Sequence, residues 1–253
     1  MCIISSYVKK VSKTKIFTMP SQDSKRQLTV YMNSVDSPVT NIMCLPVPNP
    51  DSVQFEKVPK NLFNFCEASF PEPIKEPEMT WSWSLSRDPL EIKSHGSYEV
   101  VLIPSSDDFD RIPDSFELTE AVQKFLIENY SKNFGFLLCR LKKGSVRYEP
   151  FAYSHDIQDT SLFVPTKHFH IHADTDFISR LSFMPKLSSK ADWDHDIYTC
   201  FIPIQLKDIS HDSEIEWEEM PKGFRCGPDY PLQRLKCIGS SHKNEDLSFY
   251  LTK

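Results

Sequence analysis

Five of the eight histidines lie between residues 155 and 195, and three of them alternate along residues 168–172. Side chains alternate faces along an extended strand, so His168, His170 and His172 are expected on one face. Imidazoles at i and i+2 can bind one zinc or iron ion together with ligands from another strand. The candidates for those further ligands are His155, Asp156, His195 and Asp196. The spacing therefore predicts a metal site, and the alternative, which we favour, is a solvated or hydrogen-bonded histidine face.

Two catalytic hypotheses use single residues. His195 has Asp192 and Asp196 close by in sequence, and an imidazole oriented by a carboxylate can act as a general base. Cys2 follows Met1 and precedes an apolar strand, a pattern typical of amidohydrolases with an N-terminal nucleophile. In that class the thiol attacks an amide after Met1 is removed, and the new α-amino group takes the proton. The alternative for Cys2 is a small buried apolar residue.

A serine hydrolase triad is not indicated. The G-x-S-x-G pattern is missing from the sequence. Ser154, His155 and Asp156 are adjacent, whereas the members of a triad come from separate parts of a chain.

The charge balance argues against a general nucleic-acid partner. The chain of 253 residues has 29 Lys+Arg and 35 Asp+Glu, a net charge of -6. Binding to a phosphate backbone needs a positive surface. The charges are nevertheless separated along the chain, with a basic N-terminal end and an acidic segment at 208–219. These segments are two solvated faces or, alternatively, complementary docking surfaces in an assembly.

Cysteine and glycine usage narrows the class further. The seven cysteines are scattered without a C-x-x-C pair, so we expect reduced thiols and a cytoplasmic protein. Only 6 glycines occur, and no glycine-rich phosphate loop is among them, which argues against nucleotide-binding folds that use such loops. No apolar run is long enough to span a bilayer, so we expect no membrane partner.

Hydrophobic periodicity predicts mostly strands. Segments 15–19 and 27–32 flank a polar turn and predict a hairpin, and segments 134–141 and 147–152 predict a second one across Lys142-Lys143. The spacing of apolar residues predicts a short helix at 61–70 and a longer one at 115–130. The expected fold class is therefore α+β, a mostly antiparallel sheet or a sandwich with about two helices.

The stretch 71–93 holds four prolines and fits no regular period, so it predicts a long loop. Trp81 and Trp83 would share a face if it were extended, and they are candidates for anchoring a partner. The alternative is a flap packed on the protein's own core. We expect one domain over residues 1–205 and an acidic, irregular extension over 206–253.

Four phrases support that division. They are Arg26-Gln27-Leu28-Thr29-Val30-Tyr31, Leu45-Pro46-Val47-Pro48, Pro150-Phe151-Ala152-Tyr153-Ser154-His155-Asp156 and Asp192-Trp193-Asp194-His195-Asp196-Ile197-Tyr198. Together they resemble an uncharacterised protein group from protists, bacteria and large viruses. The resemblance spans residues 1–205 and implies no activity or site.

The sequence contains no complete catalytic signature, and its proline-rich and acidic segments suit draping over a partner. We therefore predict a non-catalytic structural or interaction protein without a cofactor. It would dock with protein partners in a larger cytoplasmic assembly, such as a cytoskeletal, axonemal or virion lattice. The alternative is a hydrolase, either dependent on zinc or iron at His168, His170 and His195 or using Cys2.

Overall fold

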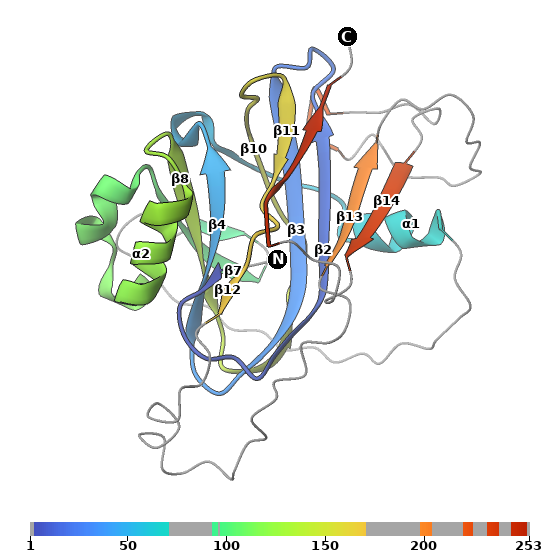
Figure 1. The fold of residues 1–253 in the computed structure, drawn as a ribbon. Helices are drawn as coiled ribbons and strands as arrows, with labels where there is room; N and C mark the ends of the chain where they lie inside the picture. Colours follow the sequence, from blue (N-terminus) through green and yellow to red (C-terminus); the bar gives the residue numbers. More distant parts are fainter. Residues whose placement is uncertain are drawn as a thin grey trace.

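Two mixed β-sheets packed face to face form the body of the protein (Figure 1). The structure is a computed structural model, and it describes residues 3–70, 93–95, 97–170, 198–203, 220–224, 232–237 and 244–251. The predicted class, a mostly antiparallel α+β sandwich with about two helices, is confirmed.

Sheet A has six strands. In spatial order they are β12 (Phe169–His170), β1 (Ile3–Ile4), β4 (Asn41–Pro48), β8 (Phe134–Leu141), β7 (Tyr98–Ile103) and β6 (Lys93–His95). Neighbouring strands are antiparallel except β1 and β12, which run parallel. Strand β4 is buried at every residue, because it lies inside the sheet and both of its faces are covered.

Sheet B has seven strands. They are β14 (Leu232–Cys237), β13 (Tyr198–Pro203), β2 (Lys10–Pro20), β3 (Arg26–Ser37), β10 (Phe151–Asp156) and β5 (Gln54–Glu56) in spatial order, with β9 (Gly144–Arg147) pairing with the end of β3. The predicted hairpin of β2 and β3 is confirmed, with Pro20 opposite Gln27 at its turn. A further two-stranded sheet joins β11 (Ser161–Val164) to β15 (Leu247–Tyr250).

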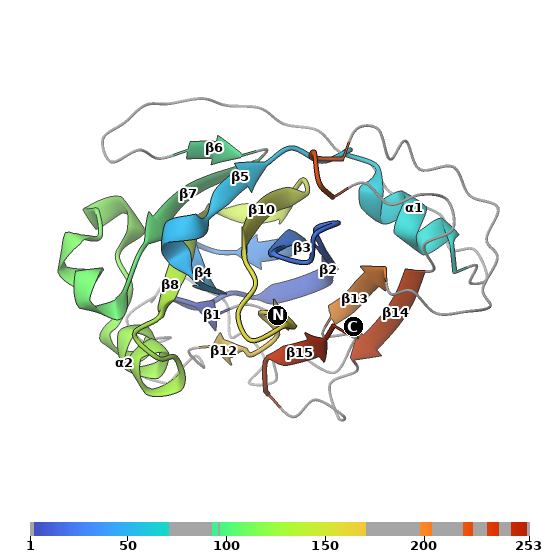
Figure 2. The same ribbon diagram turned by 90° about the horizontal axis from the view of Figure 1, so that it is seen from above.

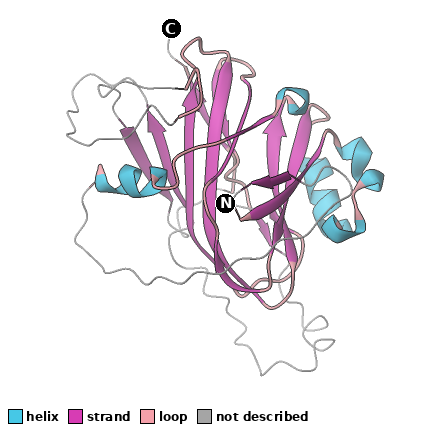
Figure 3. Cartoon of the chain, turned by 180° about the vertical axis from the view of Figure 1, so that it is seen from behind, coloured by secondary structure: helices cyan, strands magenta, loops and turns pink. Residues whose placement is uncertain are grey.

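Helices cover the outer face of each sheet, on opposite sides of the sandwich (Figure 2). Helix α1 (Leu62–Ala68) packs on sheet B, where Leu62, Phe63 and Cys66 join the apolar cluster. Helix α2 (Glu120–Asn129) packs on sheet A together with the 3-10 turns η2 (Ser106–Arg111) and η3 (Asp114–Phe116). Seen from behind, the helices flank the strands on both sides (Figure 3). Among the described residues, no helix has the length and apolar character needed to cross a bilayer.

The alternation of β3 shows how the layers arise. Tyr31 and Val35 point between the two sheets, whereas Val30 and Met32 point outward beneath α1. The protein therefore has one apolar layer between the sheets and a second and third layer beneath the helices. Each layer removes apolar surface from water, which is the main stabilising contribution to such a fold.

One polar bridge crosses the central layer. The hydroxyl of Tyr98 on β7 donates to Oδ1 of Asn33 on β3 at 2.9 Å, and both side chains are buried. The Tyr98 ring stacks on Tyr148 with 4.4 Å between centroids. The Tyr148 hydroxyl accepts the backbone N–H of Lys142 at 2.6 Å. Sheet A is thus tied to sheet B by a directional contact as well as by apolar packing.

Two predicted elements differ from the structure. The predicted hairpin of 134–141 with 147–152 is wrong, because β8 pairs with β4 and β7 whereas β9 pairs with β3 in the other sheet. Strand β8 is apolar on both faces and is buried between two neighbours of sheet A, so Lys142-Lys143 carries the chain across to sheet B. The helix predicted from Ser115 starts at Glu120, because Phe116 and Leu118 are both buried around an extended Glu117.

The described parts of 206–253 add regular structure to the sandwich. Strand β14 pairs with β13, and β15 pairs with β11. Met220 and Phe224 are buried in the layer beneath α1. These segments therefore complete the core that the first 205 residues begin.

Replacing Tyr98 with Phe should lower the free energy of unfolding by about 1–3 kcal/mol, because it leaves the buried Oδ1 of Asn33 without its donor. Urea denaturation of the purified variant measures this loss. Tyr250→Phe is the matched control, since Tyr250 is 79% exposed and should leave stability unchanged. Equal stability of the two variants would show that the bridge contributes nothing.

Candidate functional site

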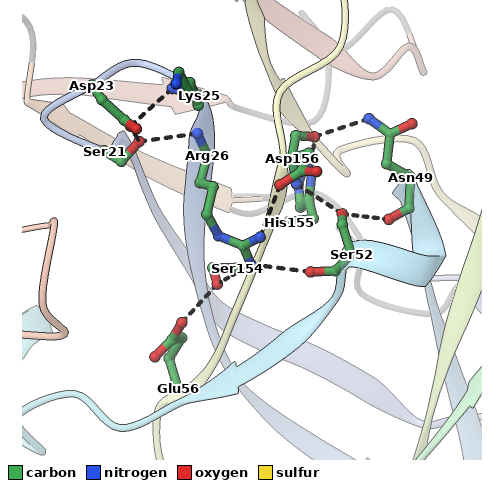
Figure 4. Close-up of polar contacts among 10 residues, drawn as sticks. All are labelled: Ser21, Asp23, Lys25, Arg26, Asn49, Ser52, Glu56, Ser154, His155 and Asp156. Atoms are coloured by element: carbon green, nitrogen blue, oxygen red, sulfur yellow. Dashed lines mark hydrogen bonds and ion pairs between the residues drawn. The ribbon is translucent and has the colours of Figure 1, made fainter.

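The densest polar cluster lies at one end of sheet B, where β3 begins and β10 ends (Figure 4). The guanidinium of Arg26 donates to Oδ1 of Asp156 at 2.8 Å, to Oγ of Ser154 at 2.9 Å and to the carbonyl of Ser52 at 3.0 Å. Ser154 in turn donates to a carboxylate oxygen of Glu56 at 2.6 Å. The cluster therefore joins three segments that are distant in the sequence.

The 3-10 turn η1 (Pro50–Ser52) is held by the same cluster. The Ser52 hydroxyl accepts the backbone N–H of Asp156 at 2.9 Å and donates to the carbonyl of Asn49 at 2.7 Å. The side-chain amide of Asn49 donates to the carbonyl of Asp156 at 3.0 Å. We call these residues, with Arg26, Ser154 and Glu56, the Arg26 clasp.

The nearby turn between β2 and β3 is fixed in the same manner. The Ser21 hydroxyl donates to Asp23 at 2.6 Å and accepts the backbone N–H of Arg26 at 2.9 Å. The hydrogen bond from Ser21, aided by the backbone N–H of Lys25, lowers the pKa of the Asp23 carboxyl. Together these contacts fix the start of β3 and so the direction of the Arg26 side chain.

The clasp has the character of a structural joint. Ser154 is fully buried, and its hydroxyl is engaged both as a donor and as an acceptor. A nucleophilic serine must be reached by its substrate, whereas the Ser154 hydroxyl is fully buried between Arg26 and Glu56.

His155 lies on the opposite face of β10 from Ser154 and points into the region between the sheets. Its ring stacks with the ring of Tyr153, with 6.1 Å between the two centroids. Its Nδ1 lies 2.9 Å from the carbonyl of Asp156, so the proton is on Nδ1 because a carbonyl only accepts. Nε2 is buried and makes no hydrogen bond to any described residue. Burial lowers the pKa of His155 to about 4, so the ring is neutral near pH 7.

The predicted metal ligands are only partly within the described chain. His155 lies on β10 of sheet B, whereas His170 lies on β12 of sheet A, directly after His168 and Phe169. Among the described residues, no three His, Cys, Asp or Glu side chains come together as a metal site. His172, His195 and Asp196 lie outside the described residues, so the zinc or iron site stays a prediction.

The other predicted site residues, Cys2, Trp81 and Trp83, also lie outside the described residues. Five cysteines lie within them, and four of these, Cys44, Cys66, Cys139 and Cys200, are buried thiols. Burial raises the pKa of both Cys44 and Cys66 well above the ordinary thiol value. These two thiols therefore stay protonated at neutral pH, whereas thiol chemistry proceeds through the thiolate.

A half-buried carboxylate, Asp246, anchors the C-terminal strand. One oxygen of Asp246 accepts the backbone N–H groups of Thr166 and Lys167 at 2.9 and 2.7 Å, and the other accepts the Tyr130 hydroxyl at 2.8 Å. Burial raises the pKa of Asp246 against the opposing effect of these hydrogen bonds. This contact attaches β15 to the end of α2 and to the segment before β12.

An open cavity of about 460 Å³ lies where β1 and β4 meet the turn η3. Its lining includes Ser5, Thr40, Asn41, Asp114, Glu117 and Arg140. The side chain of Asn41 accepts from the Ser5 hydroxyl and the Ser6 N–H at 3.0 and 2.9 Å, which fixes the floor. Arg140 forms an ion pair with Glu99 at 3.0 Å. The two carboxylates of Asp114 and Glu117 therefore give the cavity a net negative charge.

Exposed cations lie at the same end of the sandwich as this cavity. They are Lys9, Lys10, Lys13, Lys142, Lys143 and Arg147, which we call the lysine cluster. The start of β2, the end of β3 and β9 lie side by side there, with Lys10 opposite Asp36 and Asp36 opposite Ser145. Within the described part of the chain, neither these six cations nor Asp114 and Glu117 form an ion pair.

The cations near the N-terminus are close together in the sequence, whereas the fold places them in different surroundings. Lys9, Lys10 and Lys13 are exposed in the lysine cluster, whereas Lys15 forms a 2.6 Å ion pair with Glu67 of α1. Arg26 belongs to the clasp at the other end of the β2–β3 hairpin. The acidic segment 208–219 lies outside the described residues. The cavity and the contribution of Lys142 and Lys143 were missed, because only the fold brings these parts together.

No protein-family model matches the chain. Among solved structures, the crystal structure of baculovirus P35 is similar, with a TM-score of 0.46 and 12% sequence identity. The match covers 98% of this chain and 87% of that chain.

Replacing Arg26 with Lys should lower the free energy of unfolding by about 1–2 kcal/mol, because an ammonium cannot reproduce the three-way fork of the guanidinium. Thermal and urea denaturation measure the loss. Arg147→Lys is the matched control, since Arg147 is exposed and makes no ion pair with a described residue. An equal loss of unfolding free energy in both variants would show that the contacts of Arg26 in the clasp do not stabilise the fold.

His155 should make the fold less stable in mild acid. The unfolded chain binds a proton near the ordinary histidine pKa of 6.5, whereas the folded protein binds it only near 4. The stabilisation is therefore complete above pH 6.5 and falls by about 3 kcal/mol as the pH drops to 4. Urea midpoints between pH 7.5 and 4 measure the slope. His155→Gln should flatten it, and an unchanged slope would assign the acid sensitivity to other groups.

Proposed function

We propose that this chain is a non-catalytic interaction protein that docks with protein partners in a larger cytoplasmic assembly. The observation that carries the proposal is an exposed lysine cluster at the same end of the sandwich as a cavity with two carboxylates, since none of these charges has an ion-pair partner within the described chain. Complementary charges of this kind direct association and suppress wrong partners.

Several described hydroxyl, carboxylate and thiol groups support the same proposal through their contacts. The Ser154 hydroxyl holds Glu56 and Arg26 together, and Asp156 receives the Arg26 guanidinium. The described thiols of Cys44 and Cys66 are buried and protonated. Each of these groups has a structural task in the fold.

The cytoplasmic part of the proposal rests on the thiols. The described cysteines Cys44, Cys66, Cys139 and Cys200 are buried thiols, which suits a reducing compartment. A protein partner is favoured over a nucleic acid because the whole chain carries a net charge of -6. The cytoskeletal, axonemal or virion nature of the assembly stays a prediction, as does the alternative of a hydrolase that uses Cys2 or the His168, His170 and His195 set.

The proposal is tested in a gently prepared extract of the cells that make the protein. The wild-type chain should sediment in a particle larger than its 29.4 kDa monomer. The charge-reversing variant Asp114→Lys/Glu117→Lys should shift to the monomer position, because both carboxylates are exposed on the proposed docking surface.

Asp51→Lys/Glu128→Lys is the matched control, since it makes the same change of charge at exposed residues away from the cavity. This control should keep the wild-type sedimentation. A wild-type protein that sediments as a monomer in the extract would contradict the proposed function.

A further inference from the structure

We propose that one docking partner is a second copy of this chain, with Lys142 and Lys143 of each copy entering the carboxylate cavity of the other. This inference rests on the proposed function and names one partner for it. The lysine cluster and the cavity lie at the same end of the sandwich, so one copy presents both halves of a complementary contact.

The cavity has the chemistry of a receptor for an ammonium group. Asp114 and Glu117 supply two exposed carboxylates, and the lining adds the hydroxyls of Ser115 and Thr119 as further acceptors. A lysine ammonium has three donors and no acceptor, so it suits a site that offers several oxygens. The cation that already lines the cavity, Arg140, is neutralised by Glu99 and leaves the site net negative.

The size of the cavity also suits this use. It is open to solvent and has a volume of about 460 Å³, so a side chain of a partner can reach its lining. Its floor is already formed, because the Asn41 side chain holds Ser5, Ser6 and the carbonyl of Tyr7 in place. A partner side chain would therefore enter without first ordering the site, which keeps the entropic cost of binding low.

Lys142 and Lys143 are well placed as the incoming groups. They form the connection that carries the chain from β8 in sheet A to β9 in sheet B, and both side chains are exposed. The backbone beneath them is fixed, since the N–H of Lys142 donates to the buried Tyr148 at 2.6 Å. Lys142 and Lys143 are therefore two exposed charges on a fixed stretch of backbone.

The connectivity of the chain places Lys142 and Lys143 next to the cavity. Arg140 of the cavity lining precedes Lys142 by two residues, and Ser6 of the lining precedes Lys9 by three. Inside one chain, neither Lys142 nor Lys143 forms an ion pair with Asp114 or Glu117. Two copies related by a two-fold axis can satisfy both contacts at once, which gives a closed, isologous dimer.

The arrangement of opposite charges on this surface favours a second copy over an unrelated acidic protein. Lys142 and Lys143 follow Arg140 of the cavity lining within three residues, so a partner that reaches these two cations also approaches the net negative cavity. An unrelated acidic partner would satisfy the cations and would be repelled by Asp114 and Glu117. A second copy satisfies both.

The test uses the purified full-length chain in sedimentation-velocity ultracentrifugation at about 50 mM and about 500 mM salt, where screening differs strongly. Wild type should form a dimer at low salt that weakens at high salt. Lys142→Glu/Lys143→Glu and Asp114→Lys/Glu117→Lys should each raise the dimer dissociation constant by at least about tenfold. An equimolar mixture of the two variants should restore a 1:1 heterodimer, because each mutated surface then meets a surface of opposite sign.

Lys57→Glu/Lys222→Glu is the matched control, as it reverses two exposed cations outside the lysine cluster and should dimerise like wild type. A wild type that stays monomeric at low salt, a dimer that neither variant weakens, or a mixture that does not associate would each overturn the inference. Binding of RNA that depends on Lys142 and Lys143 without self-association would also overturn it. A monomer in purified form together with a large particle in the extract would sink this inference alone and leave the proposed function standing.

Discussion

The central constraint on this protein is that both sheets are covered on both faces. Apolar layers lie between the sheets, beneath α1 and beneath α2, so a central strand such as β4 is buried at every position. Polar side chains within these layers must find hydrogen-bond partners, as Asn33 does with Tyr98. Polar groups are otherwise displaced to the ends of the strands, and both the Arg26 clasp and the cavity lie at such ends.

The two ends of sheet B serve different purposes because of how their charges are paired. At the clasp, Arg26 meets Asp156 across the β3–β10 register, and its remaining donors meet Ser154 and Ser52. A guanidinium used in this way stabilises the joint between three segments and offers little to a partner. At the other end, Lys10 and Arg147 remain exposed on the outer face of the sheet. That second end therefore carries exposed cations that make no ion pair with a described residue.

The sequence predicts the parts of the fold that depend on local pattern. The alternation in 27–32 and the polar turn before it are sufficient for the β2–β3 hairpin, which the structure contains. The pattern around 134–152 is just as regular, yet its two strands belong to different sheets. Local periodicity gives the face on which a side chain lies and does not identify the neighbouring strand. The late start of α2 has a similar cause, since burial of Phe116 and Leu118 against sheet A overrides helical spacing.

The candidate site was harder to predict, because its contacts join distant segments. Arg26 and Ser154 are 128 residues apart, and Asp114 meets Arg140 and Ser5 at one cavity only after sheet A has formed. The sequence indicates that basic and acidic residues are separated along the chain. It does not show that Lys15 and Arg26 form ion pairs within the fold, with Glu67 and Asp156.

The location of the remaining charges also determines what kind of association they can support. Exposed ion pairs contribute little in water, with a typical value of about 0–1 kcal/mol, because both groups are well solvated before they meet. Asp114 and Glu117 are exposed, so each contact with Lys142 or Lys143 of a second copy is weak alone. The proposed dimer therefore depends on several such contacts, which a two-fold arrangement repeats. Its strength should still depend on salt, and this suits a protein that assembles reversibly.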